Sequence, residues 1–194
     1  MTPRGVVPSP GPEAIAAHYA SGYEADRLHQ GAGQLDRERS RELLGRFLPP
    51  APATVLDVGG GPGGHACWLA ARGYQVHLLD ITPLHVELAR QASARQPQAP
   101  LAGAEVGDAR ALAWGSGTAD AVVLFGPLYH LTDRADRVRA LQEAYRVLRP
   151  GGVLLAAAIS RFACFRPMDQ VLQAAPGPFQ SLEVRVVHYL VERR

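Results

Sequence analysis

Short apolar runs alternate along this chain with longer stretches in which apolar side chains recur every three or four positions. The short runs are typical of buried strands, and the longer stretches are typical of amphipathic helices. The predicted strands are residues 54–58, 75–79, 101–106, 120–125 and 153–159, and the predicted helices are residues 12–30, 35–48, 63–72, 83–96 and 133–148. A turn or short helix is expected at residues 110–114. Because strands and helices alternate, the pattern predicts an α/β fold in which helices cover both faces of a mostly parallel sheet.

A glycine-rich segment joins the first of these strands to the helix that follows it. Residues 57–64 read Asp-Val-Gly-Gly-Gly-Pro-Gly-Gly. Glycine lets the backbone turn sharply and lets a ligand approach the bare main chain. The free N–H groups at the start of the next helix point toward the same place. The segment therefore predicts a binding site for a nucleotide-like molecule.

Two cofactor classes compete for this segment. Gly59, Gly61 and Gly64 match the G-x-G-x-x-G pattern of dinucleotide-binding loops, which favours a nicotinamide or flavin cofactor. Asp57 argues against that interpretation, because a carboxylate just before the first glycine would repel a pyrophosphate at close range. It suits instead a ligand with a cationic portion and no phosphate. S-adenosylmethionine is such a ligand.

The pattern Asp57-x-Gly59-x-Gly61-x-Gly63 resembles the first motif of the class I S-adenosylmethionine-dependent methyltransferases. The resemblance covers about residues 12–160 and includes the Leu-Arg-Pro-Gly-Gly turn before the fifth strand. It implies a Rossmann-like methyltransferase fold, with S-adenosylmethionine as cofactor and S-adenosylhomocysteine as product. It also implies that the methionine end of the cofactor is held by Asp57, Gly59, Gly60 and Gly61.

Two further acidic residues follow predicted strands. Asp80 ends the second strand, where a carboxylate can accept hydrogen bonds from the ribose hydroxyls of either cofactor. We therefore expect Asp80 and Ile81 to contact the ribose. Asp108 follows the third strand, and the resemblance implies that it accepts from the adenine amino group while the backbone of Ala109 contacts the ring. Three acidic residues at successive strand ends, together with the glycine segment, indicate this family more specifically than any one of them alone.

The resemblance weakens after residue 160. Such enzymes commonly carry a long segment that covers the substrate and then two further strands, whereas here residues 161–194 remain. We expect a short helix at 168–175 and one long strand at 182–191, because no turn residues divide that run. The expected fold is three-layered and doubly wound, with about six strands in the order 3-2-1-4-5-6 and the last strand antiparallel. A shortened cover also allows an alternative function, a catalytically silent S-adenosylmethionine-binding module that acts through a partner or dimer.

Length and composition are those of a single domain. The chain has 194 residues, of which 47% are apolar, so it is long enough to bury a substantial core. Residues 1–11 are predicted to be a flexible leader, and residues 12–194 one methyltransferase-like domain. That domain is expected to comprise N-terminal helices at 12–48, a cofactor-binding core at 53–160 and a shortened C-terminal part at 161–194. With neither a membrane-spanning apolar run nor the apolar core of a signal peptide, the sequence predicts a cytoplasmic protein.

Residues after the fourth strand should border the transferred methyl group, because ligands of open parallel sheets bind beyond the carboxyl ends of the strands. Phe125 and Gly126 are the predicted contacts at that position. His130 is a candidate general base, since its unperturbed pKa suits proton transfer near neutral pH. The alternative for His130 is a histidine that packs at the start of a helix.

The predicted N-terminal helices add four more candidates. Tyr19 and Tyr23 are expected to stack on the cofactor or to hydrogen-bond it, and Tyr23 is also a candidate catalytic residue. Arg27 and Arg41 are candidates to pair with the methionine carboxylate. An ordinary packing stripe explains the helical spacing of positions 19, 23 and 27 equally well.

Residue types that the chain lacks exclude several functions. The absence of lysine excludes a P-loop ATPase and a pyridoxal-phosphate enzyme. The absence of asparagine excludes the Asn-Pro-Pro-aromatic signature of methyltransferases that act on the amines of nucleic-acid bases. The formal net charge is +2 and arginines are mixed with acidic residues, so we expect no nucleic-acid partner. The histidines and cysteines lack metal-ligand spacing, so no metal site is expected.

Together these observations predict methyl transfer from S-adenosylmethionine to a small-molecule acceptor. The silent binding module and an NAD(P)-dependent oxidoreductase are the alternatives. A sheet edge or pocket rim left exposed by the shortened C-terminal part makes a homodimer a reasonable further expectation.

Overall fold

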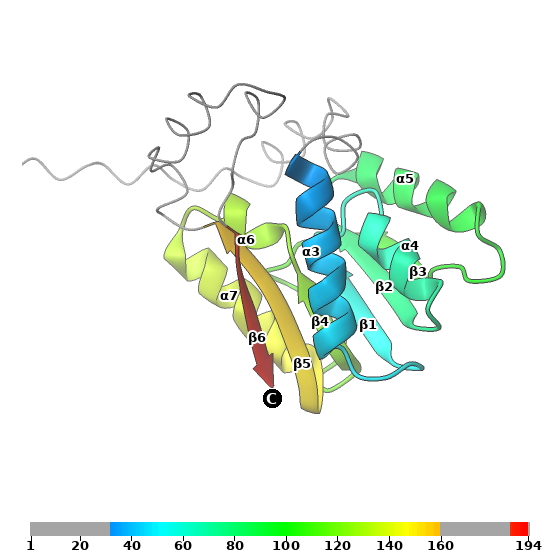
Figure 1. Cartoon of the computed structure of the whole chain (residues 1–194). Helices are drawn as coiled ribbons and strands as arrows, with labels where there is room; N and C mark the ends of the chain where they lie inside the picture. Colours follow the sequence, from blue (N-terminus) through cyan, green and yellow to red (C-terminus); the bar gives the residue numbers. More distant parts are fainter. Residues whose placement is uncertain (1–31, 160–186, 194) are drawn as a thin grey trace, which may run out of the picture.

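A six-stranded sheet with the order β3-β2-β1-β4-β5-β6 forms the centre of the molecule (Figure 1). Strands β1 to β5 pair in parallel, and β6 pairs antiparallel with β5. The predicted strand order and the predicted antiparallel last strand are therefore confirmed. The strands are β1 (Thr54–Val58), β2 (Gln75–Asp80), β3 (Gly103–Val106), β4 (Ala119–Leu124), β5 (Leu148–Ile159) and β6 (Val187–Arg193).

This computed structural model describes residues 32–159 and 187–193. The predicted leader at 1–11 and the predicted helices at 12–30 and 168–175 lie outside these residues. The domain boundaries expected from the sequence accordingly stay predictions.

Helices cover both faces of the sheet, as the alternation of strands and helices predicts (Figure 1). Residues Ala121 and Val123 of β4 face one hydrophobic cluster, which holds the apolar sides of α3, α4 and α5. Residues Val122 and Leu124 face a second cluster, which holds the apolar side of α7. The helices are α3 (Ala32–Phe47), α4 (Gly64–Ala70), α5 (Pro83–Ala94), α6 (Pro127–His130) and α7 (Arg134–Val147).

The ends of two helices follow from short polar residues beside them. Asp133 is the N-cap of α7, and its carboxylate accepts a hydrogen bond from the backbone N–H of Ala135 at 2.7 Å. Thr82 is the N-cap of α5 and Pro83 follows at the first helical position, but the hydroxyl of Thr82 makes no capping hydrogen bond.

Two predicted turns differ in detail from the structure. Residues 149–152 were expected as a tight turn between a helix and a strand, but they lie inside β5 as a bulge. The register shows why: Leu148 pairs with Ala119 and Val153 with Ala121, so six residues of β5 lie opposite three residues of β4. The predicted turn or short helix at 110–114 is a turn closed by a bridge between Asp108 and Ala111.

The helices in the described part of the chain include no candidate membrane span. None of them is both long enough and apolar enough to cross a bilayer.

Two adjacent residues of α3 provide a test of this packing. Leu44 is fully buried against the sheet, whereas a Cβ added to Gly45 would meet nothing within 4 Å. Leu44→Ala is expected to lower the free energy of unfolding by about 3 kcal/mol, because it leaves a cavity in the core. Gly45→Ala is expected to raise it by about 0.5–1 kcal/mol, because alanine favours the helix. Urea unfolding of both variants checks the packing, and equal effects would contradict it.

Candidate functional site

The glycine segment folds into a tight loop between β1 and α4. Gly59, Gly61 and Gly63 all have positive φ angles, of 74°, 55° and 88°. Side chains rarely tolerate that conformation, so the alternation of glycines is what this loop requires. The N–H groups of Gly59 and Gly60 donate to the carbonyl of Leu79 at 2.7 and 3.2 Å, which fixes the loop to the end of β2.

Asp57 lies beneath this loop rather than at an exposed mouth. Its side chain is buried, with 3% of the residue exposed, and Oδ2 has no hydrogen-bond partner among the described residues. A Cβ on Gly60 would lie only 2.8 Å from that oxygen, so glycine leaves room for the carboxylate. Burial, together with the neighbouring charge of Asp80, raises the pKa of Asp57 to about 7. The carboxylate is therefore easily protonated until a cation approaches it.

These features fit the predicted cofactor. A buried acceptor atom without a partner is costly, and an ammonium group would supply both the missing hydrogen bond and the missing counter-charge. The backbone of the loop is also accessible, because a Cβ on Gly61 would meet nothing within 4 Å. Asp57 and the glycines would hold the methionine end, as the resemblance implies.

Asp80 connects the end of β2 to the glycine loop. Its Oδ2 accepts from the N–H of Gly61 at 2.8 Å, and its Oδ1 accepts from the N–H of Thr82 at 2.8 Å. The ring nitrogen Nδ1 of His85 lies 3.2 Å from the same Oδ1. Burial alone would raise the pKa of Asp80, but these hydrogen bonds outweigh it and hold the pKa below its usual range. Asp80 is thus an ionised acceptor at the predicted ribose position, beside the half-buried Ile81.

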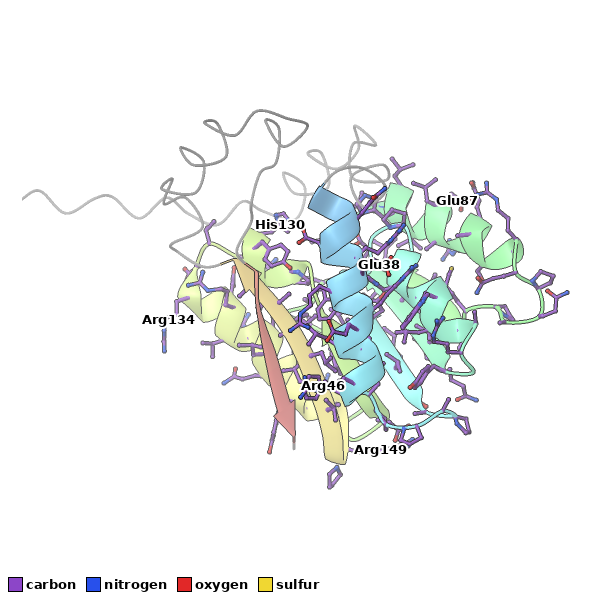
Figure 2. All side chains as sticks on the ribbon, in the orientation of Figure 1. Glu38, Arg46, Glu87, His130, Arg134 and Arg149 are labelled. Atoms are coloured by element: carbon purple, nitrogen blue, oxygen red, sulfur yellow. The ribbon has the colours of Figure 1, made fainter. Side chains whose placement is uncertain are left out.

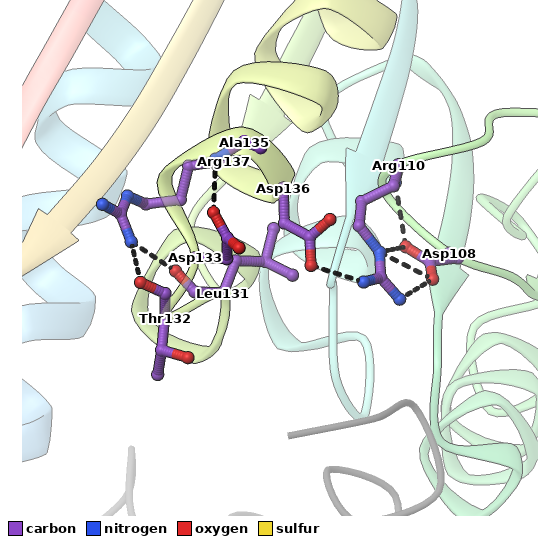
Figure 3. Close-up of polar contacts among 8 residues, drawn as sticks. All are labelled: Asp108, Arg110, Leu131, Thr132, Asp133, Ala135, Asp136 and Arg137. Carbon is purple, nitrogen blue, oxygen red and sulfur yellow. Dashed lines mark hydrogen bonds and ion pairs between the residues drawn. The ribbon is translucent and has the colours of Figure 1, made fainter. Parts of the chain in front are cut away.

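Asp108 lies two residues beyond β3 and is held by an arginine (Figure 3). The guanidinium of Arg110 donates to both carboxylate oxygens of Asp108, at 2.6 to 3.0 Å, and to Asp136 of α7 at 2.7 Å. Burial opposes ionisation of Asp108, but the contacts with Arg110 prevail and lower its pKa. The predicted adenine acceptor is therefore anionic and fixed in orientation. The adjacent Ala109 is buried in the core.

The segment after β4 packs directly on the glycine loop. A Cβ on Gly126 would lie 3.0 Å from the carbonyl oxygen of Gly59, and a Cβ on Gly59 would clash with the ring of Pro127. Gly126 stays a predicted ligand contact, and in the structure its lack of a side chain also allows the close approach of this loop. Phe125 is half-buried beside the same region, with its ring edge-on to His65 at 6.0 Å.

His65 and Arg41 are two polar groups near this loop whose environment sequence reasoning did not identify. Nδ1 of His65 and Nε of Arg41 are both buried without a hydrogen-bond partner in the described part of the chain. Burial, with the charges of Arg41 and Arg37, lowers the pKa of His65 to about 4, so His65 is neutral near pH 7. Arg41 is a predicted partner of the methionine carboxylate and stays a prediction. The sequence marks His65 only by its place in the first turn of α4.

Of the remaining candidate site residues, only His130 lies within the described residues. His130 ends the short helix α6 and is half-buried, with its ring 6.1 Å from that of Tyr129 (Figure 2). That position tests neither the role of a base nor the packing interpretation, which placed His130 at the start of a helix. Tyr19, Tyr23 and Arg27 lie outside the described residues. Across residues 32–159 and 187–193, no group of three histidine, cysteine, aspartate or glutamate side chains is arranged to hold a metal ion.

Comparisons with known proteins agree with this geometry. A family described as "Methyltransferase domain" matches residues 56–156. A ubiquinone/menaquinone biosynthesis C-methyltransferase of Acidiphilium cryptum is 36% identical over 122 residues, which are 62% of this chain and 48% of that protein. A ribosomal RNA small subunit methyltransferase C of Chromohalobacter salexigens is 34% identical over 159 residues, 78% of this chain and 45% of that protein.

A solved structure is similar as well. The S-adenosylmethionine-dependent methyltransferase of Methanosarcina mazei superposes with a TM-score of 0.54 at 28% identity, covering 61% of this chain and 57% of that one. The chain spans about half the length of the curated relatives it matches.

The buried carboxylate predicts an unusual effect on stability. The pKa of Asp57 is about 7 in the folded protein and about 4 in an unfolded chain, so its ionisation opposes folding as the pH rises between these values. Asp57→Asn, which cannot ionise, is expected to raise the free energy of unfolding by about 2 kcal/mol at pH 8 and to lose this gain below about pH 4. Thermal melts at both pH values measure the difference.

Asp120→Asn is the matched control for this substitution. Asp120 accepts from the N–H of Thr54 and pairs with Arg149, so the same change should destabilise the protein at pH 8. An Asp57→Asn protein that is less stable than the wild type at pH 8 would contradict the assignment.

Proposed function

Since this chain belongs to the class I S-adenosylmethionine-dependent methyltransferase family, we propose that it transfers a methyl group from S-adenosylmethionine to a small-molecule acceptor. The family match covers β1 to β5 and therefore includes the glycine loop and all three acidic positions of the site. The activity of the whole protein is a proposal, because the chain spans only about half of its curated relatives.

The observation that carries the proposal is the buried, unpartnered Oδ2 of Asp57 beneath a bare glycine backbone. This oxygen would accept a hydrogen bond from the ammonium group of the cofactor, and it opposes a pyrophosphate for the same electrostatic reason. Asp80 would accept from the ribose, and Asp108 from the adenine amino group. When bound, the cofactor supplies an activated methyl group on a sulfonium, so the protein has mainly to align and desolvate the acceptor.

A small-molecule acceptor is favoured over a nucleic acid by one relative and by the state of the arginines. The relative from Acidiphilium cryptum is named for methylation in quinone biosynthesis, whereas the relative from Chromohalobacter salexigens is named for ribosomal RNA. Six of the described arginines pair with carboxylates: Arg37, Arg39, Arg41, Arg110, Arg146 and Arg149. Nucleic-acid recognition relies on cations that are free to meet phosphates.

Self-association is part of the same proposal. The edge strand β3 carries Val106 with 54% of its surface exposed. An exposed apolar residue on a sheet edge is suited to pairing with a second copy. Light scattering at micromolar concentration should give the mass of a dimer, and a monomer would remove this part of the proposal.

Calorimetric titration tests the choice of cofactor. We expect S-adenosylmethionine and S-adenosylhomocysteine to bind, and NAD to give no measurable heat under the same conditions. Gly60→Ala should weaken both complexes at least tenfold, because its Cβ would displace the carboxylate of Asp57. Gly45→Ala is the matched control, since its Cβ meets no neighbour. Strong binding of NAD with no binding of the sulfur compounds would overturn the assignment in favour of an oxidoreductase.

Turnover distinguishes an enzyme from a silent binding module. A panel of phenols and quinols, small amines and ribosomal RNA can be scored by the S-adenosylhomocysteine that each one releases. We expect release with a small acceptor and none with RNA. Tight binding of the cofactor without turnover on any acceptor would favour the module, and turnover on RNA alone would refute the acceptor class.

A further inference from the structure

We infer that His85 is a positioning residue, which orients the carboxylate of Asp80 so that only Oδ2 faces the ribose of the cofactor. The inference rests on the proposed function, because it concerns how that same site recognises its ligand. It adds a histidine on α5 that no sequence pattern singled out. Three buried polar residues carry it: Asp80, Thr82 and His85, with 6%, 2% and 4% of their surfaces exposed.

The contact between His85 and Asp80 has a defined direction. Nδ1 of His85 lies 3.2 Å from Oδ1 of Asp80, and both side chains are almost completely buried. The pKa of Asp80 is held below its usual range, so the carboxylate is ionised and can only accept a hydrogen bond. Nδ1 of His85 must therefore carry the hydrogen. Hydrogen bonds to a buried carboxylate are among the stronger ones in proteins.

The two oxygens of Asp80 are not equally occupied. Oδ1 receives the N–H of Thr82 and the N–H of His85, which satisfies both of its lone pairs. Among the described residues, Oδ2 receives only the N–H of Gly61, which leaves it one lone pair for a ligand. Because Gly61 belongs to the glycine loop, Oδ2 is the oxygen that faces the predicted ligand. A ribose hydroxyl would therefore donate to Oδ2.

Local structure explains why position 85 can do this. Pro83 starts α5 after the N-cap Thr82, so His85 occupies the third position of the helix. A side chain at that position reaches back toward the residues before the helix, as the acidic residue of a capping box does. The backbone N–H of Thr82 is already bound to Asp80, so His85 reaches the same carboxylate instead.

Without His85, one lone pair of Oδ1 would be released, and the carboxylate would lose one of the three donors that fix its rotation. The hydrogen bonds from Gly61 and Thr82 would keep Asp80 close to the loop, but its Oδ2 would be held less firmly toward the ribose. The expected consequence is a loss of affinity that depends on the ribose hydroxyls. If His85 served helix packing alone, its replacement would weaken the binding of every ligand equally.

The test combines two variants with two ligands. His85→Leu removes the donor and keeps apolar bulk, whereas His85→Asn keeps an amide N–H close to the position of Nδ1. Calorimetry measures the binding of S-adenosylhomocysteine and of its 2′,3′-dideoxy analogue. We expect His85→Leu to weaken the binding of S-adenosylhomocysteine about tenfold and the binding of the analogue less than about twofold. His85→Asn should restore most of the lost affinity.

His77→Leu is the matched control. His77 is a histidine of β2 whose ring lies edge-on to Trp114 at 6.2 Å, and its substitution should leave the ratio of the two affinities unchanged. Equal weakening of both ligands by His85→Leu, or no weakening of either, would overturn the inference while the proposed function stands. A wild-type protein that binds neither ligand would instead refute the proposed function itself.

A second measurement tests the inference even if the His85→Leu variant does not fold. Nitrogen NMR of the wild-type protein should show Nδ1 of His85 protonated. S-adenosylhomocysteine should shift that resonance, and the dideoxy analogue should shift it less. An unprotonated Nδ1, or identical shifts with both ligands, would contradict the positioning role.

Discussion

A carboxylate buried without a counter-charge is the constraint on which this site depends. Asp57 lies beneath a loop that leaves its Oδ2 no donor within the described chain, and burial raises its pKa to about 7. Keeping a charge in such a place is costly, and the cost falls when a cation arrives. The affinity of the site for a cationic ligand and the reduced stability of the free protein are therefore two consequences of one interaction.

Backbone contacts from neighbouring strands hold the loop in the conformation that Asp57 needs. The end of β2 accepts from the N–H groups of Gly59 and Gly60, and Asp80 accepts from Gly61. On the other side, the segment at Gly126 packs against the carbonyl of Gly59. The loop is fixed before any ligand binds, so little ordering has to occur on binding. Such preorganisation suits a reaction in which alignment is the main requirement.

The sequence predicted those parts of the molecule that depend on neighbours along the chain. The order of the strands and the glycine loop after β1 both follow from local patterns. It did not predict the bulge at 149–152, because that depends on the register between β4 and β5. The sequence did not predict the ion pairs of Arg110 with Asp108 and Asp136 for a similar reason, since α7 is brought to the end of β3 only by folding (Figure 3).

The site residues divide in the same way. Asp57 and Asp80 were identified by their places at strand ends, but their opposite pKa shifts are set by what surrounds them. His85 and His65 gave no signal in the sequence, because a histidine at a helix start is ordinary until its neighbours are known.

Carbon NMR of the Asp57 carboxyl group, titrated with and without S-adenosylhomocysteine, tests the central claim most directly. The account predicts a pKa near 7 in the free protein that falls by at least about two units in the complex. An ordinary pKa near 4 in the free protein, or the same pKa in both states, would contradict it.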